Sequence, residues 1–412
     1  MIKASIDFFL PFEFDQVPKI WDPWNDTWNK KSGKLFIWDC FKNPPYDGIL
    51  ISKSKFDHNK KKYIDKLKKD KNLKNLLKIP ENIMLFGDCG AFQYRNELKP
   101  PYTTQEILDY YQDYGFDMGC SIDHIITNKK DVKLREKRKL LTEQYAKECI
   151  DLFKSNKYHF ELFGVAQGWD INSYSDMVKY LYELGYENIC IGGLIGLKTL
   201  SKDPKEFTLV SLLKHLNFLF KKYNFKKIHI FGRGNISLFE LYLKCRITQF
   251  DNNIMIKAYK SIKGSYYLFD TKKHQLNYFT SIRIPLVEKM KQGLHDKEKE
   301  IFKVLNQFNE NQTSSDAFIL ELDTYYKTFK TEKNKEYTVN NNLIKKLLEE
   351  KPWEKCDCEI CKNHKIHVCI FRRRMRNTLR AFHNVFNYYC YLKSVRASKI
   401  NLQTDTKLTD FT

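Results

Sequence analysis

The sequence predicts an α/β protein built on a closed, TIM-like (β/α) barrel of at least six units, with a zinc-binding subdomain near the C-terminus. Three observations predict it: short apolar runs end in Gly, Asp or Gln, helical patterns follow these runs, and a cysteine cluster lies late in the chain. Strands that alternate with helices form parallel sheets, and polar residues at strand ends are typical of a barrel. An open doubly wound sheet is the alternative, but no G-x-G-x-x-G motif follows the first strand.

The chain begins with MIKASIDFFLPFEF, whose apolar part contains acidic residues and a proline. This composition favours a first strand over a signal peptide. The segment 53–78 is rich in lysine, and its apolar residues recur at helical spacing. It predicts either an amphipathic helix whose charged face is solvated or a basic strip that contacts phosphates.

Six apolar runs follow, and helical patterns at 103–114 and 173–185 lie between them. Thr103 precedes a glutamate by three residues, which is typical of a helix N-terminus. The predicted strands lie within 83–90, 116–124, 161–168, 188–196, 227–235 and 246–251.

The same patterns predict four segments. Residues 1–295 form the barrel core, and residues 296–350 form a helical insertion or linker with a loop near 309–316. Residues 351–400 form the zinc-binding segment and a closing helix. Residues 401–412 form a flexible tail.

Composition limits the class of protein. The chain has 412 residues, 42% apolar and 15% aromatic, so it can bury a large core. No apolar run is long enough for a membrane span, and eleven scattered cysteines without a signal peptide predict reduced thiols in the cytoplasm. The net charge of +21 favours a polyanionic partner, most often nucleic acid. An AT-biased genome, which enriches lysine, is the alternative explanation.

The strongest metal signal is the motif C-x-C-x-x-C formed by Cys356, Cys358 and Cys361. Three thiols at this spacing can bind one Zn²⁺, which then needs a fourth ligand and forms a closed, structural site. Chance clustering of reduced cysteines is the alternative. Candidates for the fourth ligand are His364, His367, Cys369 and His383.

A second set of polar residues follows the predicted strands. Two carboxylates at one barrel mouth can act as nucleophile and acid/base in glycosidic-bond chemistry. A carboxylate and an amide can read the edge of a purine-like base, and glycines let a flat ligand approach the backbone. A single Asp at a strand end is equally well explained as a cap. The set comprises Asp88, Asp123, Gln167, the Gly192-Gly193-Leu194 turn and Asp251.

These motifs, in this order, resemble the tRNA-guanine transglycosylase family. The family motifs D-S-G-G-[FY]-Q, V-Q-G-G, G-G-L, M-F-D and C-x-C-x-x-C followed by a helical His each have a counterpart here. The matching residues are Asp88–Gln93, Val165–Gly168, Gly192–Leu194, Gln249–Asp251, and Cys356, Cys358 and Cys361 with His383.

The resemblance implies an enzyme that exchanges a guanine base in nucleic acid for a 7-deazaguanine, on a (β/α)8 TIM-like barrel with a structural Zn²⁺. Asp251 would attack the sugar C1′ and form a covalent intermediate, and Asp88 would be the general acid/base. The implied zinc ligands are the three cysteines and His383. The implied base-binding residues are Asp123, Gln167, Gly192, Gly193 and Phe92, with Tyr259 as another aromatic neighbour.

The departures from the family pattern resemble its DNA-acting branch, the deoxypurine-in-DNA protein A group. Ala91 replaces a glycine, and IMIKAYKSIKG at 254–264 lacks the Pro-Thr-Arg core that follows the nucleophile in the tRNA enzymes. This branch inserts 7-cyano-7-deazaguanine into DNA, which requires base flipping in a duplex. The partners would be DNA, the incoming base and other proteins of a DNA-modification system. The alternatives are a divergent enzyme acting on tRNA and a noncatalytic nucleic-acid-binding subunit.

Overall fold

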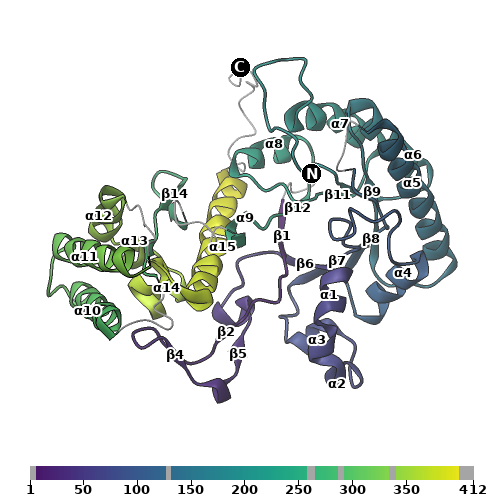
Figure 1. Cartoon of the computed structure of the whole chain (residues 1–412). Helices are drawn as coiled ribbons and strands as arrows, with labels where there is room; N and C mark the ends of the chain where they lie inside the picture. Colours follow the sequence, from purple (N-terminus) through teal and green to yellow (C-terminus); the bar gives the residue numbers. More distant parts are fainter. Residues whose placement is uncertain (1–5, 127–130, 258–264, 286–291, 334–339, 399–412) are drawn as a thin grey trace. The chain divides into compact units, whose positions relative to one another are not determined.

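The computed structural model describes residues 6–126, 131–257, 265–285, 292–333 and 340–398 (Figure 1). Tyr259 and the predicted tail, 401–412, lie outside these ranges. The chain divides into two compact units that alternate along the sequence. The first comprises Met1–Phe14, Tyr46–Asn253 and Leu392–Thr412, and the second comprises Asp15–Pro45 and Ile254–Tyr391.

The first unit is a closed barrel of eight strands in the order β1-β12-β11-β10-β9-β8-β7-β6, with every neighbouring pair parallel (Figure 1). The predicted fold is therefore confirmed. All six predicted runs contain a strand, whereas β6 was not predicted. The strands are β1 (Asp7–Pro11), β6 (Gly48–Ser52), β7 (Met84–Asp88), β8 (Met118–Cys120), β9 (Glu161–Ala166), β10 (Asn188–Ile191), β11 (Lys227–Ile230) and β12 (Gln249–Asp251).

Alternate residues of these strands fill the barrel interior, because side chains on a strand point to opposite faces in turn. Phe9, Phe86 and Phe163 belong to the buried cluster inside the barrel. The Phe9 and Phe86 rings meet edge to face at 5.7 Å. A Cβ at Gly48 would lie 2.2 Å from the Phe9 ring, so only glycine leaves room for this ring on β6. The interior is thus packed, and only its rim can accept a ligand.

Helices cover the outside of the barrel, and α4 begins as the sequence predicts. The Thr103 hydroxyl accepts a hydrogen bond from the Glu106 amide, and the Glu106 carboxylate accepts one from the Thr103 amide. The lysine-rich segment 53–78 forms several short helices rather than one long helix. The α-helices of this unit are α1 (Lys53–Lys60), α2 (Ile64–Leu67), α3 (Leu73–Leu77), α4 (Thr104–Asp113), α5 (Val132–Ser155), α6 (Ile171–Glu183), α7 (Leu209–Tyr223) and α8 (Phe239–Lys244).

The second unit combines short β-ladders with helices. Its strands β13 and β14 form an antiparallel hairpin, and β15 pairs with β16 in parallel. The predicted helical region 296–350 contains most of α10, and all of α11 and α12, with a break at 310–314 where a loop was expected. The domain limits that the sequence predicts at residues 295 and 350 are not tested by these elements and remain predictions.

The strands of this unit are β2 (Val17–Pro18), β3 (Trp21–Asp22), β4 (Thr27–Trp28), β5 (Lys34–Leu35), β13 (Tyr266–Asp270), β14 (Gln275–Phe279), β15 (Ile282–Arg283) and β16 (Ile370–Phe371). Its α-helices are α9 (Ile254–Lys257), α10 (Gln292–Asn309), α11 (Ser315–Lys333), α12 (Asn341–Glu350), α13 (Pro352–Lys355), α14 (Glu359–His364) and α15 (Arg373–Ser398). The last residues of α15 belong to the first unit. Within the described ranges, no helix combines the length and apolar character that crossing a membrane requires.

Candidate active site and metal centre

The carboxyl ends of the barrel strands place several predicted residues on one rim. Phe86, Val165 and Cys190 face the barrel interior. Residues two positions later on an extended chain face the same side. Asp88, Gln167 and Gly192 therefore follow as the next inward-facing positions at the mouth.

Asp251 is the last residue of β12 and is almost completely buried. Its Oδ1 accepts a hydrogen bond of 2.8 Å from the Gly232 amide and lies 3.2 Å from Nε2 of His229. His229 is fully buried on β11, in the middle of the apolar run KIHIF. Two partners on one oxygen fix the orientation of the carboxylate. Sequence reasoning missed His229, whose side becomes clear only from the register: it pairs with Gln249, two residues before Asp251, and so faces the same side as Asp251.

Asp88 ends β7 and is half-buried. Burial, and then the charges of Asp123 and Asp251, raise its pKa to about 7. A hydrogen bond from the Gly90 backbone acts in the opposite direction. A carboxyl group with this pKa is present in both protonation states near neutrality. It can therefore donate a proton in one step and accept one in another.

Asp123 and Gln167 form a buried pair. Gln167 Nε2 donates to Asp123 Oδ2 at 2.5 Å, and the Cys89 thiol donates to Asp123 Oδ1 at 3.1 Å. Burial raises the pKa of Asp123 to about 6, against the lowering effect of these two hydrogen bonds. Gln167 Oε1 is buried and finds no hydrogen-bond partner among the described residues. An unpaired buried acceptor beside a carboxylate suits the N–H groups of a flat heterocycle.

Gly192 and Gly193 pass directly over the Gln167 amide. A Cβ at Gly192 would lie 2.5 Å from Gln167 Nε2, and one at Gly193 would lie 2.4 Å from Oε1. Gly193 also has a φ of +69°, which side-chain-bearing residues rarely adopt. The Tyr174 hydroxyl donates to the Gly192 carbonyl at 2.8 Å and holds the turn. Both glycines therefore fix the place of the Gln167 amide.

Phe92 is not part of this buried group. It lies on the turn after β7 with 48% of its surface exposed, and the Arg95 guanidinium stands 4.4 Å from its ring centroid. Arg95 also donates to the Phe92 carbonyl at 2.8 Å. Stacking of Phe92 on a base stays a prediction.

Ser52 is a further residue of the rim that sequence reasoning missed. It ends β6, pairs in register with Asp88, and follows the inward-facing Leu50 by two residues. Its side chain makes no capping hydrogen bond to α1, and its buried Oγ has no partner in the described part of the chain. The missed strand β6 explains why this hydroxyl was not found.

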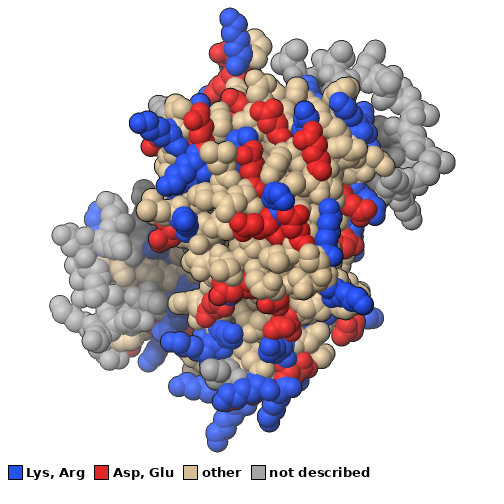
Figure 2. All heavy atoms as spheres, turned by 90° about the vertical axis from the view of Figure 1, so that its right-hand side faces the viewer, with Lys and Arg blue, Asp and Glu red and all other residues tan. Residues whose placement is uncertain are grey.

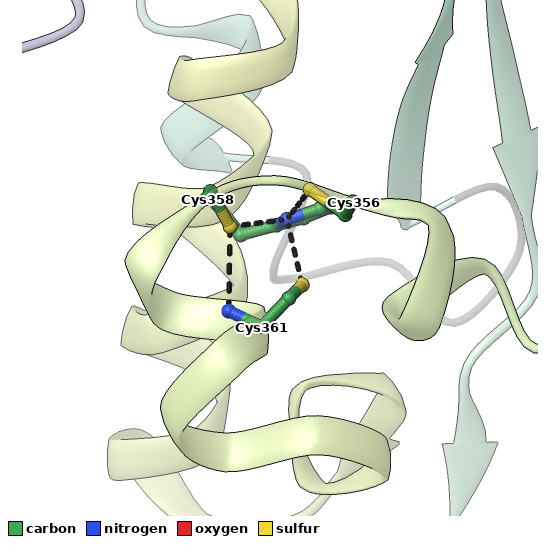
Figure 3. A group of neighbouring side chains, drawn as sticks. Cys356, Cys358 and Cys361 are labelled. Atoms are coloured by element: carbon green, nitrogen blue, oxygen red, sulfur yellow. Dashed lines mark hydrogen bonds between the residues drawn. The ribbon is translucent and has the colours of Figure 1, made fainter.

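The second unit holds the predicted metal ligands in one cluster. The Sγ atoms of Cys356, Cys358 and Cys361 lie 3.6, 3.3 and 3.2 Å from Nδ1 of His383, and all four residues are buried. Figure 3 shows the three cysteine side chains converging on one point. Of the four candidates for the fourth ligand, the structure places His383 with the cysteines. This cluster can hold a metal ion.

The neighbours of this cluster orient its ligands. His383 Nε2 donates to the Tyr267 carbonyl at 2.7 Å, which leaves the lone pair of Nδ1 directed at the three sulfurs. The Tyr266 ring stacks on the imidazole at 4.1 Å, and Asn387 Nδ2 donates to Cys356 Sγ at 3.4 Å. Such outer hydrogen bonds fix the tautomer of a metal-binding histidine. The donor set and its orientation fit a tetrahedral ion.

A comparison with curated proteins shows the family of the chain. No family model matches the chain. The chain is similar to a DNA-guanine transglycosylase of Salmonella montevideo, with 30% identity over an alignment that covers 96% of this chain and 99% of that protein. The similarity extends over nearly the full length of both chains. The chain belongs to the DNA-guanine transglycosylase family.

Proposed function

We propose that this enzyme exchanges guanine in DNA for a 7-deazaguanine, with 7-cyano-7-deazaguanine as the expected base, through a covalent intermediate on Asp251. The observation that carries the proposal is the rim of the barrel. It combines an oriented carboxylate, a carboxyl group with a pKa of about 7 and a buried carboxylate–amide pair. The name of the Salmonella protein supports DNA as the substrate.

In the first half-reaction, an oxygen of Asp251 attacks C1′ of a deoxyguanosine that has left the base stack. The bond between C1′ and the base breaks, and protonated Asp88 gives its proton to the departing guanine. The sugar is then bonded to the Asp251 carboxylate. The hydrogen bonds of Gly232 and His229 to Oδ1 hold this carboxylate in the orientation for attack.

In the second half-reaction, the Asp88 carboxylate takes a proton from the incoming base. That base attacks C1′ from the face that guanine left, and Asp251 is released. Two displacements on one carbon preserve its configuration. The pKa of about 7 suits Asp88 to both proton transfers.

The buried pair at the rim would select the base. The Asp123 carboxylate is an acceptor for the N–H groups on the pairing edge of a guanine-like ring, and Gln167 Oε1 is a second acceptor beside it. Adenine presents a different pattern of donors and acceptors, so it would leave buried acceptors unpaired. The glycines at 192 and 193 keep the amide in place for this contact.

The second unit would hold a structural Zn²⁺ through Cys356, Cys358, Cys361 and His383. Three thiolates and one imidazole complete a tetrahedral shell and leave no open position for catalysis. The ion would join the segment 356–361 to α15, which carries His383.

The test is incorporation of labelled guanine and of labelled 7-cyano-7-deazaguanine, with duplex DNA and tRNA offered side by side. We expect label in DNA with the wild type and with Asp65→Asn, a control at an exposed carboxylate on α2. Asp251→Asn should give no label and no covalent protein–DNA adduct under denaturing conditions. Exchange at the wild-type rate by Asp251→Asn contradicts the nucleophile, and label in tRNA alone contradicts the substrate.

A further inference from the structure

Two buried cysteines at the rim have no part in the proposed reaction. Cys89 directly follows Asp88, and Cys120 ends the neighbouring strand β8. The register between these strands pairs Gly87 with Gly119, which places Asp88 beside Cys120. One carboxylate oxygen of Asp88 and the two Sγ atoms all lie within 4.8 Å of one another. Both cysteines are free thiols.

We propose that Asp88, Cys89 and Cys120 form a second metal site, which binds a thiophilic divalent cation such as Zn²⁺ and thereby inhibits the enzyme. Thiolate sulfur with one carboxylate oxygen is a donor set that such cations prefer. Three protein ligands leave a fourth position for water, as in accessible zinc sites. The inhibition rests on the proposed role of Asp88, whereas the binding does not.

The surroundings of the cluster hold its ligands in place. The Cys89 sulfur lies 2.9 Å from the Tyr94 hydroxyl and 3.1 Å from Asp123 Oδ1. The Tyr111 hydroxyl donates to the Cys120 carbonyl at 3.1 Å and lies 3.9 Å from its sulfur. A cation at this place would therefore have the Asp123 carboxylate close by as an additional negative group.

Burial of the two thiols does not argue against this site. The four residues of the Cys356 cluster are also buried, and their ligand atoms likewise lie within 4.8 Å of one another. Asp88 is half-buried as a residue, whereas both cysteines are fully buried, so a cation would approach from the side of Asp88. Binding releases the two thiol protons, and the proton of Asp88 where it carries one, to solvent, and forms two metal–sulfur bonds and one metal–oxygen bond.

Asp88 belongs both to the proposed metal site and to the proposed reaction, so a bound cation should affect catalysis. A cation bound to Asp88 blocks the oxygen that would give a proton to the departing base. It also draws Cys89 away from its hydrogen bond to Asp123, which would serve base binding. The cation should therefore inhibit base exchange reversibly. A chelator that binds zinc less tightly than the Cys356 cluster does should restore base exchange.

The first readout is zinc content after equilibrium dialysis of the zinc-loaded full chain against Zn²⁺. We expect about two ions per chain in the wild type and about one in Cys120→Ser, because a hydroxyl is a poor ligand for this ion. Cys190→Ser is the matched control, because Cys190 is equally buried in the same barrel cluster but lies outside the proposed site. Cys190→Ser should bind as the wild type does.

The second readout is base exchange at the same Zn²⁺ concentrations. Zn²⁺ should inhibit the wild type and Cys190→Ser, and Cys120→Ser should remain active. One ion per wild-type chain, or a second ion that persists in Cys120→Ser, overturns the site. A second ion that depends on Cys120 but leaves exchange unaffected keeps the metal site and instead contradicts the role of Asp88.

Discussion

Asp88, at the end of β7, changes its protonation state in the physiological pH range. Burial contributes most to its raised pKa of about 7, and the nearby carboxylates Asp123 and Asp251 add to it. In the first half-reaction, the protonated form of Asp88 is the active one. This fraction is high below pH 7 and falls as the pH rises through about 7.

We therefore expect the rate of guanine release to fall as the pH rises through about 7. A single-turnover measurement of guanine release from DNA across this range reports the step directly. Asp88→Asn should lose this pH dependence and release guanine more slowly by a factor of about 10² to 10⁴, the usual contribution of a general acid. A release rate that rises through pH 7 contradicts Asp88 as the acid in this step.

Gly193 gives a second prediction at the scale of one residue. Gly193→Ala puts a Cβ 2.4 Å from Gln167 Oε1, so the amide must move and KM for the incoming base should rise. Gly196→Ala is the matched control, because Gly196 also has a positive φ, of +77°, but a Cβ there meets nothing within 4 Å. Equal kinetic effects of both substitutions would show that backbone strain, and not the Gln167 contact, is responsible.

At the scale of elements, α15 is bound to the edge of β13 by three polar side chains. His383 donates to the Tyr267 carbonyl, and the Asn384 and Asn387 side-chain oxygens accept from the backbone amides of Tyr267 and Phe269. These side chains take the place of a neighbouring strand. The metal ligands Cys356, Cys358 and Cys361 add a further connection to the same helix.

We expect His383→Ala to lose most of the bound zinc and to lower the temperature at which the protein unfolds. It removes a ligand and also leaves the Tyr267 carbonyl without its donor. Metal analysis after dialysis into zinc-free buffer, which removes any ion at the weaker second site, should give about one ion per chain for the wild type. His215→Ala, at an exposed position on α7, should match the wild type in both measurements. Zinc content unchanged by His383→Ala would contradict the fourth ligand.

The sequence predicts those elements whose signal is local. The six predicted strands and the cap at Thr103 depend on local patterns, which the residues themselves contain. Strand β6 has five residues, lies just after two prolines and leads into a lysine-rich helix, so its local signal is weak. Its pairing with β1 and β7 is what defines it. Ser52 could not be placed at the rim without that pairing.

His229 was missed for a different reason. It lies within an apolar run in which every residue is suited to burial, so the run predicts a strand without showing which side faces inward. Its contact with Asp251 joins strands β11 and β12 at their carboxyl ends. In the same way, the joining of Asp15–Pro45 to Ile254–Tyr391 in one unit depends on contacts between distant segments. Composition and periodicity contain neither kind of information.

At the scale of the whole molecule, the basic side chains do not form one continuous positive surface on the face that Figure 2 shows. Lys and Arg side chains lie among Asp and Glu over most of the face in Figure 2. Many described lysines, such as Lys147 and Lys226, form ion pairs with nearby carboxylates. The net charge of +21 must then act through the basic residues that lack such partners and through the field of the whole chain.

Binding of DNA should therefore depend steeply on salt, whereas the chemical step should not. We expect KM for DNA to rise with ionic strength, because each phosphate contact releases counterions and adds about 0.9 to the slope of log affinity against log salt. The rate at saturating DNA should stay nearly constant, since Asp251, Asp123 and Gln167 are buried. KM for the uncharged incoming base is the internal control and should not change.

The same measurement decides the role of the lysine-rich segment. Lys60, Lys61 and Lys69 are exposed there, and replacing all three with Ala reduces the salt slope only if they contact phosphates. Lys221 and Lys222 give the control, because they lie at the end of α7 that leads into the start of β11, away from the rim. Their replacement should leave the slope unchanged. A slope that changes in both variants in proportion to the lysines removed reflects net charge alone. An unchanged slope in the triple variant makes the segment a solvated surface.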